Sequence, residues 1–229
     1  MFPTHPPDTI ENLSDLFRLF EKRWTVDKPA LFRGEPARFA TNLCPSAFRE
    51  RQPADEIEST ESAFATYRAS GNSDYMFDRL FPNAAPDALA TVALLQHCGT
   101  PTRLLDVAFN PLVALYFASA SHGDEDGFVF AHFDNFLNVT GATNERSLRR
   151  LLQMDHYGDY RPNPDTLLLY RPEWHNTRSA AQSGAFLLTK GFIQYLWGGV
   201  AFRVPADSKP QIQKQLVRFA ITQEHLFPQ

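Results

Sequence analysis

An apolar stretch in the middle of the chain, LVALYFASAS at residues 112–121, places the strongest constraint on the fold. Asn110 and Pro111 precede it, and they are the residue types preferred at a helix N-cap and at the first helical position. The predicted helix continues until Gly123 and is apolar on nearly all sides, so it has no face suited to water. We therefore expect this helix at the centre of the molecule.

A chain of 229 residues is long enough to bury such a helix in one core without disulfides. No apolar run approaches the ~20 residues needed to cross a bilayer, and the first ten residues lack the pattern of a secretory signal. Cys44 and Cys98 are predicted to be small buried hydrophobes in a reducing compartment, although two cysteines could also pair. We expect a cytoplasmic protein with no membrane partner.

The net charge of −4 gives no bulk attraction to nucleic acid or to anionic lipid. A small basic cleft would still suffice for a nucleic-acid enzyme, so this class is disfavoured rather than ruled out. The 7 histidines are scattered without the short, paired spacings of a zinc site, and we expect no bound metal.

The spacing of apolar residues predicts the remaining elements. Helices are expected at residues 13–24, 56–69, 86–96 and 210–220, and Gly99 and Pro101 end the third of them. Strands are expected at residues 31–33, 127–133, 167–170, 185–189, 192–196 and 201–204, with Gly34 ending the first. Residues 138–164 are polar and irregular and fit a mobile insertion.

This order predicts an α+β fold in a single domain, residues 11–229, behind an N-terminal arm at residues 1–10. Helices come first, and a small, mostly antiparallel sheet then packs around the central apolar helix. A ligand cleft beside that helix fits the same arrangement.

The segment before the central helix is unusually polar for a loop that packs on a buried element. Its hydrogen-bonding side chains are Gln96, His97, Thr100, Thr102, Arg103 and Asp106. So many polar groups favour the wall of a pocket. We interpret residues 99–110 as a loop that leads into a helix N-terminus, where free N–H groups and the helix dipole favour an anion.

A second marker is Arg33, which stands between Phe32 and Gly34. Its guanidinium offers a planar donor fork for a pyrophosphate or a carboxylate, and Gly34 allows close approach of backbone or ligand. If Arg33 and the polar segment face one cleft, a phosphate-bearing ligand is indicated, with His97 and Asp106 as acid/base or ribose-binding groups. The alternative is a purely structural ion pair between Asp106 and one of the arginines.

These motifs resemble the FRG domain, which is named for its Phe/Tyr-Arg-Gly signature. The resemblance is carried by residues 32–34, by QHCGTPTRLLD at 96–106 and by NPLVALYFA at 110–118. RSAAQSGAF at 178–186 and LFP at 226–228 match late elements of the family. Glu35 replaces the usual glutamine and Val107-Ala108 a more typical Trp-Thr, which bears on ligand preference.

The chain also resembles ADP-ribosyltransferases, which carry an aromatic-Arg-Gly strand and later a strand that leads into a Pro-x-Val-Ala-x-x-Phe-Ala helix. This similarity implies a glycosyltransferase-like enzyme that binds NAD as its substrate and cleaves the nicotinamide–ribose bond. The implied catalytic residues are His97, Asp106 and Gln182, and the implied nucleotide-binding residues are Arg33, Gly34, Thr102, Arg103 and Asn110.

The similarity is weakest at Gln182. Such cleavage passes through an oxocarbenium-like state that a carboxylate stabilises, whereas Gln182 is neutral and no glutamate stands two residues after it. Either Asp106 or Glu35 supplies the charge, and an acceptor macromolecule then takes the ADP-ribose, or the chain is a non-catalytic module that binds a nucleotide or a partner.

Overall fold

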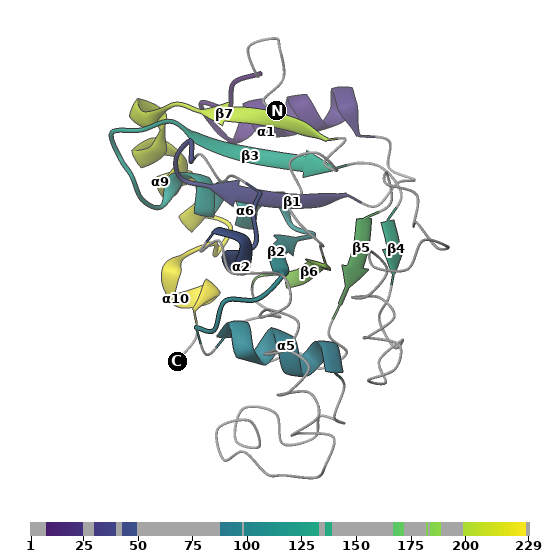
Figure 1. Ribbon diagram of the computed structural model, residues 1–229. Coiled ribbons are helices and arrows are strands. Elements are labelled where there is room, and N and C mark those ends of the chain that lie inside the picture. The colour runs from purple at the N-terminus through teal and green to yellow at the C-terminus, as the bar shows by residue number, and fades with distance from the viewer. Residues whose placement is uncertain are drawn as a thin grey trace.

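The computed structural model describes residues 8–24, 30–39, 43–49, 88–97, 99–132, 136–138, 167–171, 182, 184–188 and 199–227. The helices among them are α1 (Leu13–Arg23), α2 (Ser46–Arg49), α5 (Ala88–His97), α6 (Pro111–Ser119), the 3₁₀ turn η2 (Ala206–Ser208), α9 (Lys209–Val217) and α10 (Gln223–Leu226). The strands are β1 (Leu31–Glu35), β2 (Leu104–Ala108), β3 (Gly127–His132), β4 (Phe136–Asn138), β5 (Leu167–Tyr170), β6 (Gly184–Leu188) and β7 (Val200–Val204). Figure 1 shows their arrangement.

The strands form one 7-stranded sheet in the order β4-β5-β6-β2-β1-β3-β7. Every neighbouring pair is antiparallel except β4 and β5, which are parallel. The predicted α+β fold with a mostly antiparallel sheet is therefore confirmed. The expected helix at 56–69 and strand at 192–196 lie outside the described residues, as does most of the expected insertion at 138–164.

The sheet separates into two parts between β1 and β2. Five consecutive residues of β1 pair with β3, from Leu31 with His132 to Glu35 with Phe128, whereas β1 and β2 share only the pair Phe32 and Ala108. On the other side, β2 pairs with β6 over its whole length. Figure 1 shows the result, with β7, β3 and β1 grouped on one side of this boundary and β2, β6, β5 and β4 on the other.

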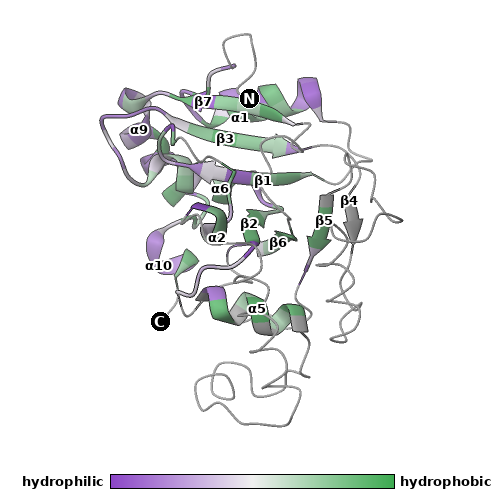
Figure 2. Ribbon diagram, in the orientation of Figure 1, coloured by the Kyte–Doolittle hydropathy of each residue, from purple (hydrophilic) through white to green (hydrophobic). Residues whose placement is uncertain are grey.

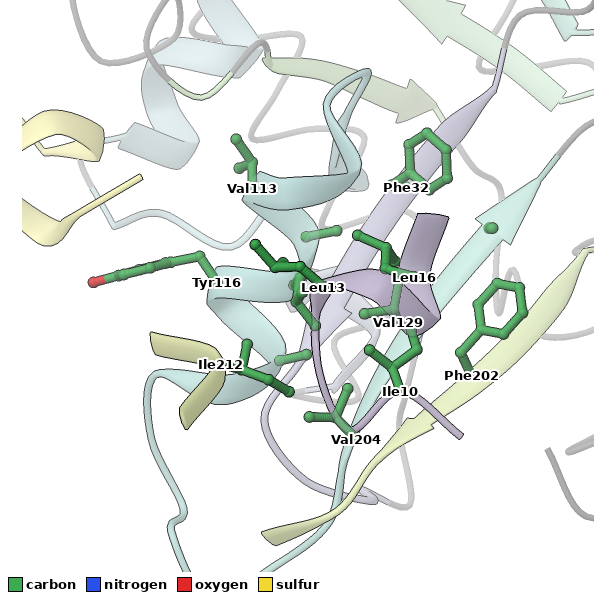
Figure 3. Packing of buried hydrophobic residues seen from close by; sticks show 14 of the residues in the cluster. Ile10, Leu13, Leu16, Phe32, Val113, Tyr116, Val129, Phe202, Val204 and Ile212 are labelled. Carbon is green, nitrogen blue, oxygen red and sulfur yellow. The ribbon is translucent and has the colours of Figure 1, made fainter. Parts of the chain in front are cut away.

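The apolar helix α6 occupies the predicted central position. It packs on β1 and β3 and against α9, and most of its side chains are buried. Helices α1 and α9 complete the core on the same face of the sheet. Figure 3 shows Leu16 of α1, Val129 of β3 and Phe202 of β7 meeting in this core, and Figure 2 shows that β2 and β3 are strongly hydrophobic.

Two glycines let α6 approach the sheet at the level of the backbone. A Cβ atom at Gly34 of β1 would overlap the carbonyl group of Ala114, and one at Gly127 of β3 would overlap that of Ala118. The predicted role of Gly34 in close approach is thus confirmed for a backbone neighbour. The sequence predicted that Gly34 ends the strand. This prediction is wrong, because Gly34 pairs with Val129 inside β1.

The largest correction concerns residues 99–110, which were interpreted as a loop. Residues 104–108 form β2, and four of these five residues are buried. Gly99 does end α5 as predicted: its φ is 89°, and the next amide, that of Thr100, bonds to the carbonyl of Leu95. Helix α6 ends at Ser119, earlier than expected.

The early end of α6 is fixed by a buried lysine. The ammonium group of Lys209 donates to the carbonyl oxygens of Ser121 (2.9 Å), His122 (2.7 Å) and Pro36 (2.7 Å). Burial lowers the pKa of this lysine. One side chain thereby ties the turn after α6 to the residue that follows β1.

The last residues of the expected N-terminal arm belong to the sheet region. The amide of Ile10 donates to the carbonyl of Arg203 in β7, and the amide of Arg203 donates to that of Asp8. Ile10 is fully buried. None of the described helices is long and apolar enough to span a membrane.

The close approach of α6 to β1 yields a test by substitution. We expect Gly34→Ala to lower the free energy of unfolding by about 1–3 kcal/mol or more, because the added methyl group forces α6 away from the sheet. The matched control is Gly123→Ala, where an added Cβ meets nothing within 4 Å. Urea denaturation of both variants measures the difference, and equal stabilities would contradict this account of the packing.

Candidate functional site

A cavity of about 350 Å³ opens where β1 and β2 separate, on the face of the sheet covered by α5 and α6. It is lined by Phe32, Arg33, Gly34, Ala93, Gln96, Asp106, Val107, Ala108, Val113, Ala114, Phe117, Gln182, Gly184, Ala185 and Phe186. Its size lies within the range of ~300–1,000 Å³ typical of small-molecule sites. Four of the predicted site residues line it: Arg33, Gly34, Asp106 and Gln182.

The guanidinium of Arg33 lies in the gap between the two strands. Its Nη1 donates to the backbone carbonyl of Asp106 at 2.8 Å, and its Nε donates to Glu35 Oε1 at 2.8 Å. The side chain bonds β2 beyond the last backbone pair, Phe32 with Ala108, and so connects the two parts of the sheet. The Arg33 side chain is 17% exposed, and its Nη2 has no hydrogen-bond partner among the described residues.

Glu35 forms a buried ion pair with Arg33 and does not line the cavity. Its carboxylate is 3% exposed, and Oε1 also accepts the backbone amide of Leu43 at 3.0 Å. A buried carboxylate paired in this way neutralises the guanidinium and fixes its direction. Glu35 does not line the cavity, so of the two carboxylates considered as the source of charge only Asp106 reaches it.

Asp106 is supported by side chains from α5 and from the segment before β2. Gln96 Nε2 donates to Asp106 Oδ2 at 2.7 Å, and Thr102 Oγ1 donates to Gln96 Oε1 at 2.6 Å. The hydroxyl of Thr102 can donate only to the amide oxygen, so the amide NH₂ faces the carboxylate. Asp106 is exposed, and its Oδ1 is without a partner in the part of the chain that the structure describes.

Thr102 therefore does not line the cavity but contacts Gln96, which in turn contacts Asp106. It is fully buried, its amide bonds to the hydroxyl of Ser46 at 3.1 Å, and its own hydroxyl accepts the amide of Leu104 at 3.3 Å. The sequence predicted that Thr102 binds the ligand, whereas the structure places it behind Gln96. Gln96 belonged to the polar segment but was not singled out as a site residue.

Two further predicted residues, Arg103 and Asn110, are not among the described residues that line the cavity, and the side chain of a third, His97, cannot be placed. Arg103 is 5% exposed and buried beside β2. His97 is the last residue of α5, and its side chain lies outside the described residues. Asn110 caps α6: its Oδ1 accepts the amide of Leu112 at 2.9 Å.

The predicted anion site at the start of α6 is wrong. The amide of Leu112 bonds to the side chain of Asn110, the amide of Val113 bonds to the Asn110 carbonyl at 3.2 Å, and Pro111 has no N–H group. The first turn of this helix thus has no free donor to offer an anion.

The C-terminal segment forms part of the surroundings of the cavity, which sequence reasoning missed. Gln182 Nε2 donates to the carbonyl of Leu226 at 3.0 Å, and the ring of Phe227 lies edge-on to that of Phe117 with centroids 6.0 Å apart. Leu226 is fully buried. The signal in the sequence was the apolar pair Leu226-Phe227 in an otherwise polar terminus.

Cys44 is free and buried, as predicted for a small hydrophobic residue. Burial raises the pKa of its thiol, which disfavours the nucleophilic thiolate. Cys98 lies outside the described residues, so its burial as a small hydrophobic residue stays a prediction. The described residues include no cluster of three or more His, Cys, Asp and Glu that could hold a metal ion.

The sequence model of the FRG domain matches residues 28–127. Over this range, which is less than half of the chain, the sequence is similar to the FRG domain. The matched range includes β1, α2, α5, β2 and α6, and with them Arg33, Gln96 and Asp106, whereas Gln182 and the C-terminal segment lie beyond it. A search of curated proteins found no match to the chain, and a search of solved structures found none.

The hydrogen bonds that support Asp106 can be tested at Thr102. We expect Thr102→Val to lower the free energy of unfolding by about 1–3 kcal/mol, because the amide of Leu104 and the oxygen of Gln96 lose their partner. Thr100→Val is the matched control, since no hydrogen bond of its side chain is found among the described residues. Chemical denaturation measures both variants, and a Thr102 variant as stable as the control contradicts the proposed network.

Proposed function

We propose that the cavity binds a nucleotide of the NAD type and that the protein is an ADP-ribosyltransferase-like enzyme that cleaves the nicotinamide–ribose bond. One observation carries this proposal: Arg33 and Asp106 are joined across the gap between β1 and β2 and line the same cavity. A donor fork and a carboxylate that line one cavity fit a ligand that has both phosphate or ribose oxygens and ribose hydroxyls.

Each residue takes a distinct part in the proposed reaction. Nη2 of Arg33 donates to a ribose or pyrophosphate oxygen. The carboxylate of Asp106 stabilises the positive charge that develops on the ribose as the bond to nicotinamide breaks, and nicotinamide leaves with the bonding electrons. An acceptor hydroxyl or water then bonds to the ribose carbon and gives up its proton.

The similarity to ADP-ribosyltransferases supports the proposal at three elements. The arginine strand β1, the pair β2 and α6, and the segment around Gln182 before β6 all contribute to the lining of one cavity. Phe117 adds a half-buried aromatic ring on which a base could stack. The buried free thiol of Cys44 fits the expected cytoplasmic location.

A non-catalytic module is the second candidate, and the contacts of Gln182 favour it. This neutral residue stands where the transferases need a charge, and its amide is already bonded to the carbonyl of Leu226. The same cavity would then hold a nucleotide or a partner without transferring a group.

Nicotinamide release from NAD, followed by chromatography, tests the proposed enzyme. We expect Asp106→Asn to reduce the release at least about 100-fold, because the neutral amide no longer stabilises the oxocarbenium-like state. Arg33→Lys keeps a cation beside Glu35 but loses the planar fork, and we expect it to weaken binding. Asp124→Asn and Arg18→Lys make the same chemical changes at exposed positions and serve as matched controls.

The outcomes separate the two candidates. Release by the wild type and both controls, but not by Asp106→Asn, supports the enzyme. Saturable binding of NAD without release supports the non-catalytic module. Absence of both binding and release contradicts the nucleotide site.

A further inference from the structure

Residues 43–49 form a bridging segment across the open end of the gap between β1 and β2. The two strands are antiparallel and share the pair Phe32 and Ala108, so the gap extends from this pair toward the end of β1 and the start of β2. The bridging segment contacts the chain at both of these strand ends. It includes the short helix α2, which Figure 1 shows beside the chain that leads into β2.

On the β1 side, the bridging segment contacts the ion pair of Arg33. The backbone amide of Leu43 donates to Glu35 Oε1 at 3.0 Å, and the same oxygen accepts Nε of Arg33 at 2.8 Å. Leu43 makes this contact in the left-handed region of the backbone, with a φ of 55°. This conformation is costly for a leucine and persists where the surroundings impose it. The side chain of Leu43 is buried in one cluster with Leu31 of β1 and Leu105 of β2, which anchors the segment to both strands.

On the β2 side, the bridging segment holds the residues that support Asp106. The amide of Thr102 donates to the hydroxyl of Ser46 at 3.1 Å, and the carbonyl of Thr102 accepts the amide of Ala47 at 3.1 Å. These bonds fix the backbone of Thr102, whose side chain is linked through Gln96 to the carboxylate of Asp106. The hydroxyl of Ser46 thus belongs to a connected set of contacts that ends at the carboxylate in the cavity.

We infer that the bridging segment sets the separation of Arg33 and Asp106 across the gap, with Ser46 as a positioning residue. Two strands that share one backbone pair can widen or narrow at their open end unless another contact fixes it. Groups that act on one ligand need a fixed geometry, since a misplacement of about 1 Å can lower a rate about 100-fold. The inference rests on the proposed function for the reaction that the two groups serve, and it adds the element that positions them.

Nuclear magnetic resonance of the full chain without ligand tests the inference. The reporters are the side-chain NH₂ signals of Gln96 and the Nε–H signal of Arg33, one on each side of the gap. We expect Ser46→Ala to shift both, because the amide of Thr102 loses its partner and the bridging segment is displaced. We expect Ser46→Thr, which keeps the hydroxyl, to leave both signals near their wild-type positions. Ser14→Ala makes the same chemical change at an exposed position of α1 and is expected to shift neither.

Thr102→Val distinguishes the bridging segment from a path through β2. This variant loses the side-chain bond to Gln96 but keeps its backbone bonds to the bridging segment. We expect it to shift the signals of Gln96 and to leave the signal of Arg33 in place. An Arg33 signal that moves as far in Thr102→Val as in Ser46→Ala, or that moves in neither, overturns the inference.

Arg49→Lys keeps the test decisive if circular dichroism shows that Ser46→Ala is unfolded. Arg49 is exposed, and its Nε donates to the carbonyl of Cys44 at 2.7 Å. The lysine keeps the charge and loses this donor, so the bridging segment is loosened from its exposed end. We expect a smaller shift of both reporters in this variant and none in the matched control Arg18→Lys. An Arg33 signal unchanged by Arg49→Lys would then overturn the inference.

Nicotinamide release measures the consequence for the proposed enzyme. We expect Ser46→Ala to lower kcat about tenfold and to leave KM for NAD within about twofold, because the carboxylate is displaced while the ligand contacts remain. We expect Ser46→Thr to retain the wild-type kcat. An unchanged kcat in Ser46→Ala overturns the positioning role. If the wild type releases no nicotinamide, the proposed enzyme fails, and the signals of Gln96 and Arg33 still decide whether the bridging segment sets their separation.

Discussion

The contact between the guanidinium of Arg33 and the backbone carbonyl of Asp106 is the interaction on which the rest of the site depends. β1 and β2 share one backbone pair, and beyond it the side chain of Arg33 connects the strands. A gap in a sheet leaves backbone groups without ladder partners, which is costly unless another donor reaches them. Because a side chain meets this need, the strands can separate far enough to form a cavity while the sheet stays connected.

Helix α6, beside this gap, is held at a fixed distance from the sheet, and this fixes the shape of the cavity. Gly34 and Gly127 allow α6 to contact the sheet through backbone atoms, and Lys209 ties the turn after α6 to Pro36 behind β1. These contacts leave α6 little freedom to slide, since interiors are close-packed and an added methylene is already felt. Phe117 and Val113 therefore face the cavity from a helix whose position is set by the core.

Local signals in the sequence were sufficient for α6, because Asn110 and Pro111 specify its start and its composition requires burial. They failed for β2, since the run Leu104–Ala108 becomes a strand through its pairing with β6, about 80 residues later in the chain. The convergence of Arg33 and Asp106 followed from their chemistry. The direction of the Thr102 side chain did not, because it depends on contacts of the segment before β2 with Ser46 and Gln96. The contact of Gln182 with Leu226 joins segments that no local pattern relates.

Under the proposed function, Arg33 would serve the fold and the ligand with different atoms of one group. Nε and Nη1 are bonded to Glu35 and Asp106, and Nη2 has no hydrogen-bond partner among the described residues. This division explains why the residue is an arginine: an ammonium group could balance Glu35, but it offers no planar set of donors directed at two strands and a ligand at once. It also fixes the electrostatics, because a guanidinium already paired with a buried carboxylate contributes direction more than charge. Among the described lining residues, the carboxylate of Asp106 is consequently the charged group that would set the chemistry of the proposed ligand.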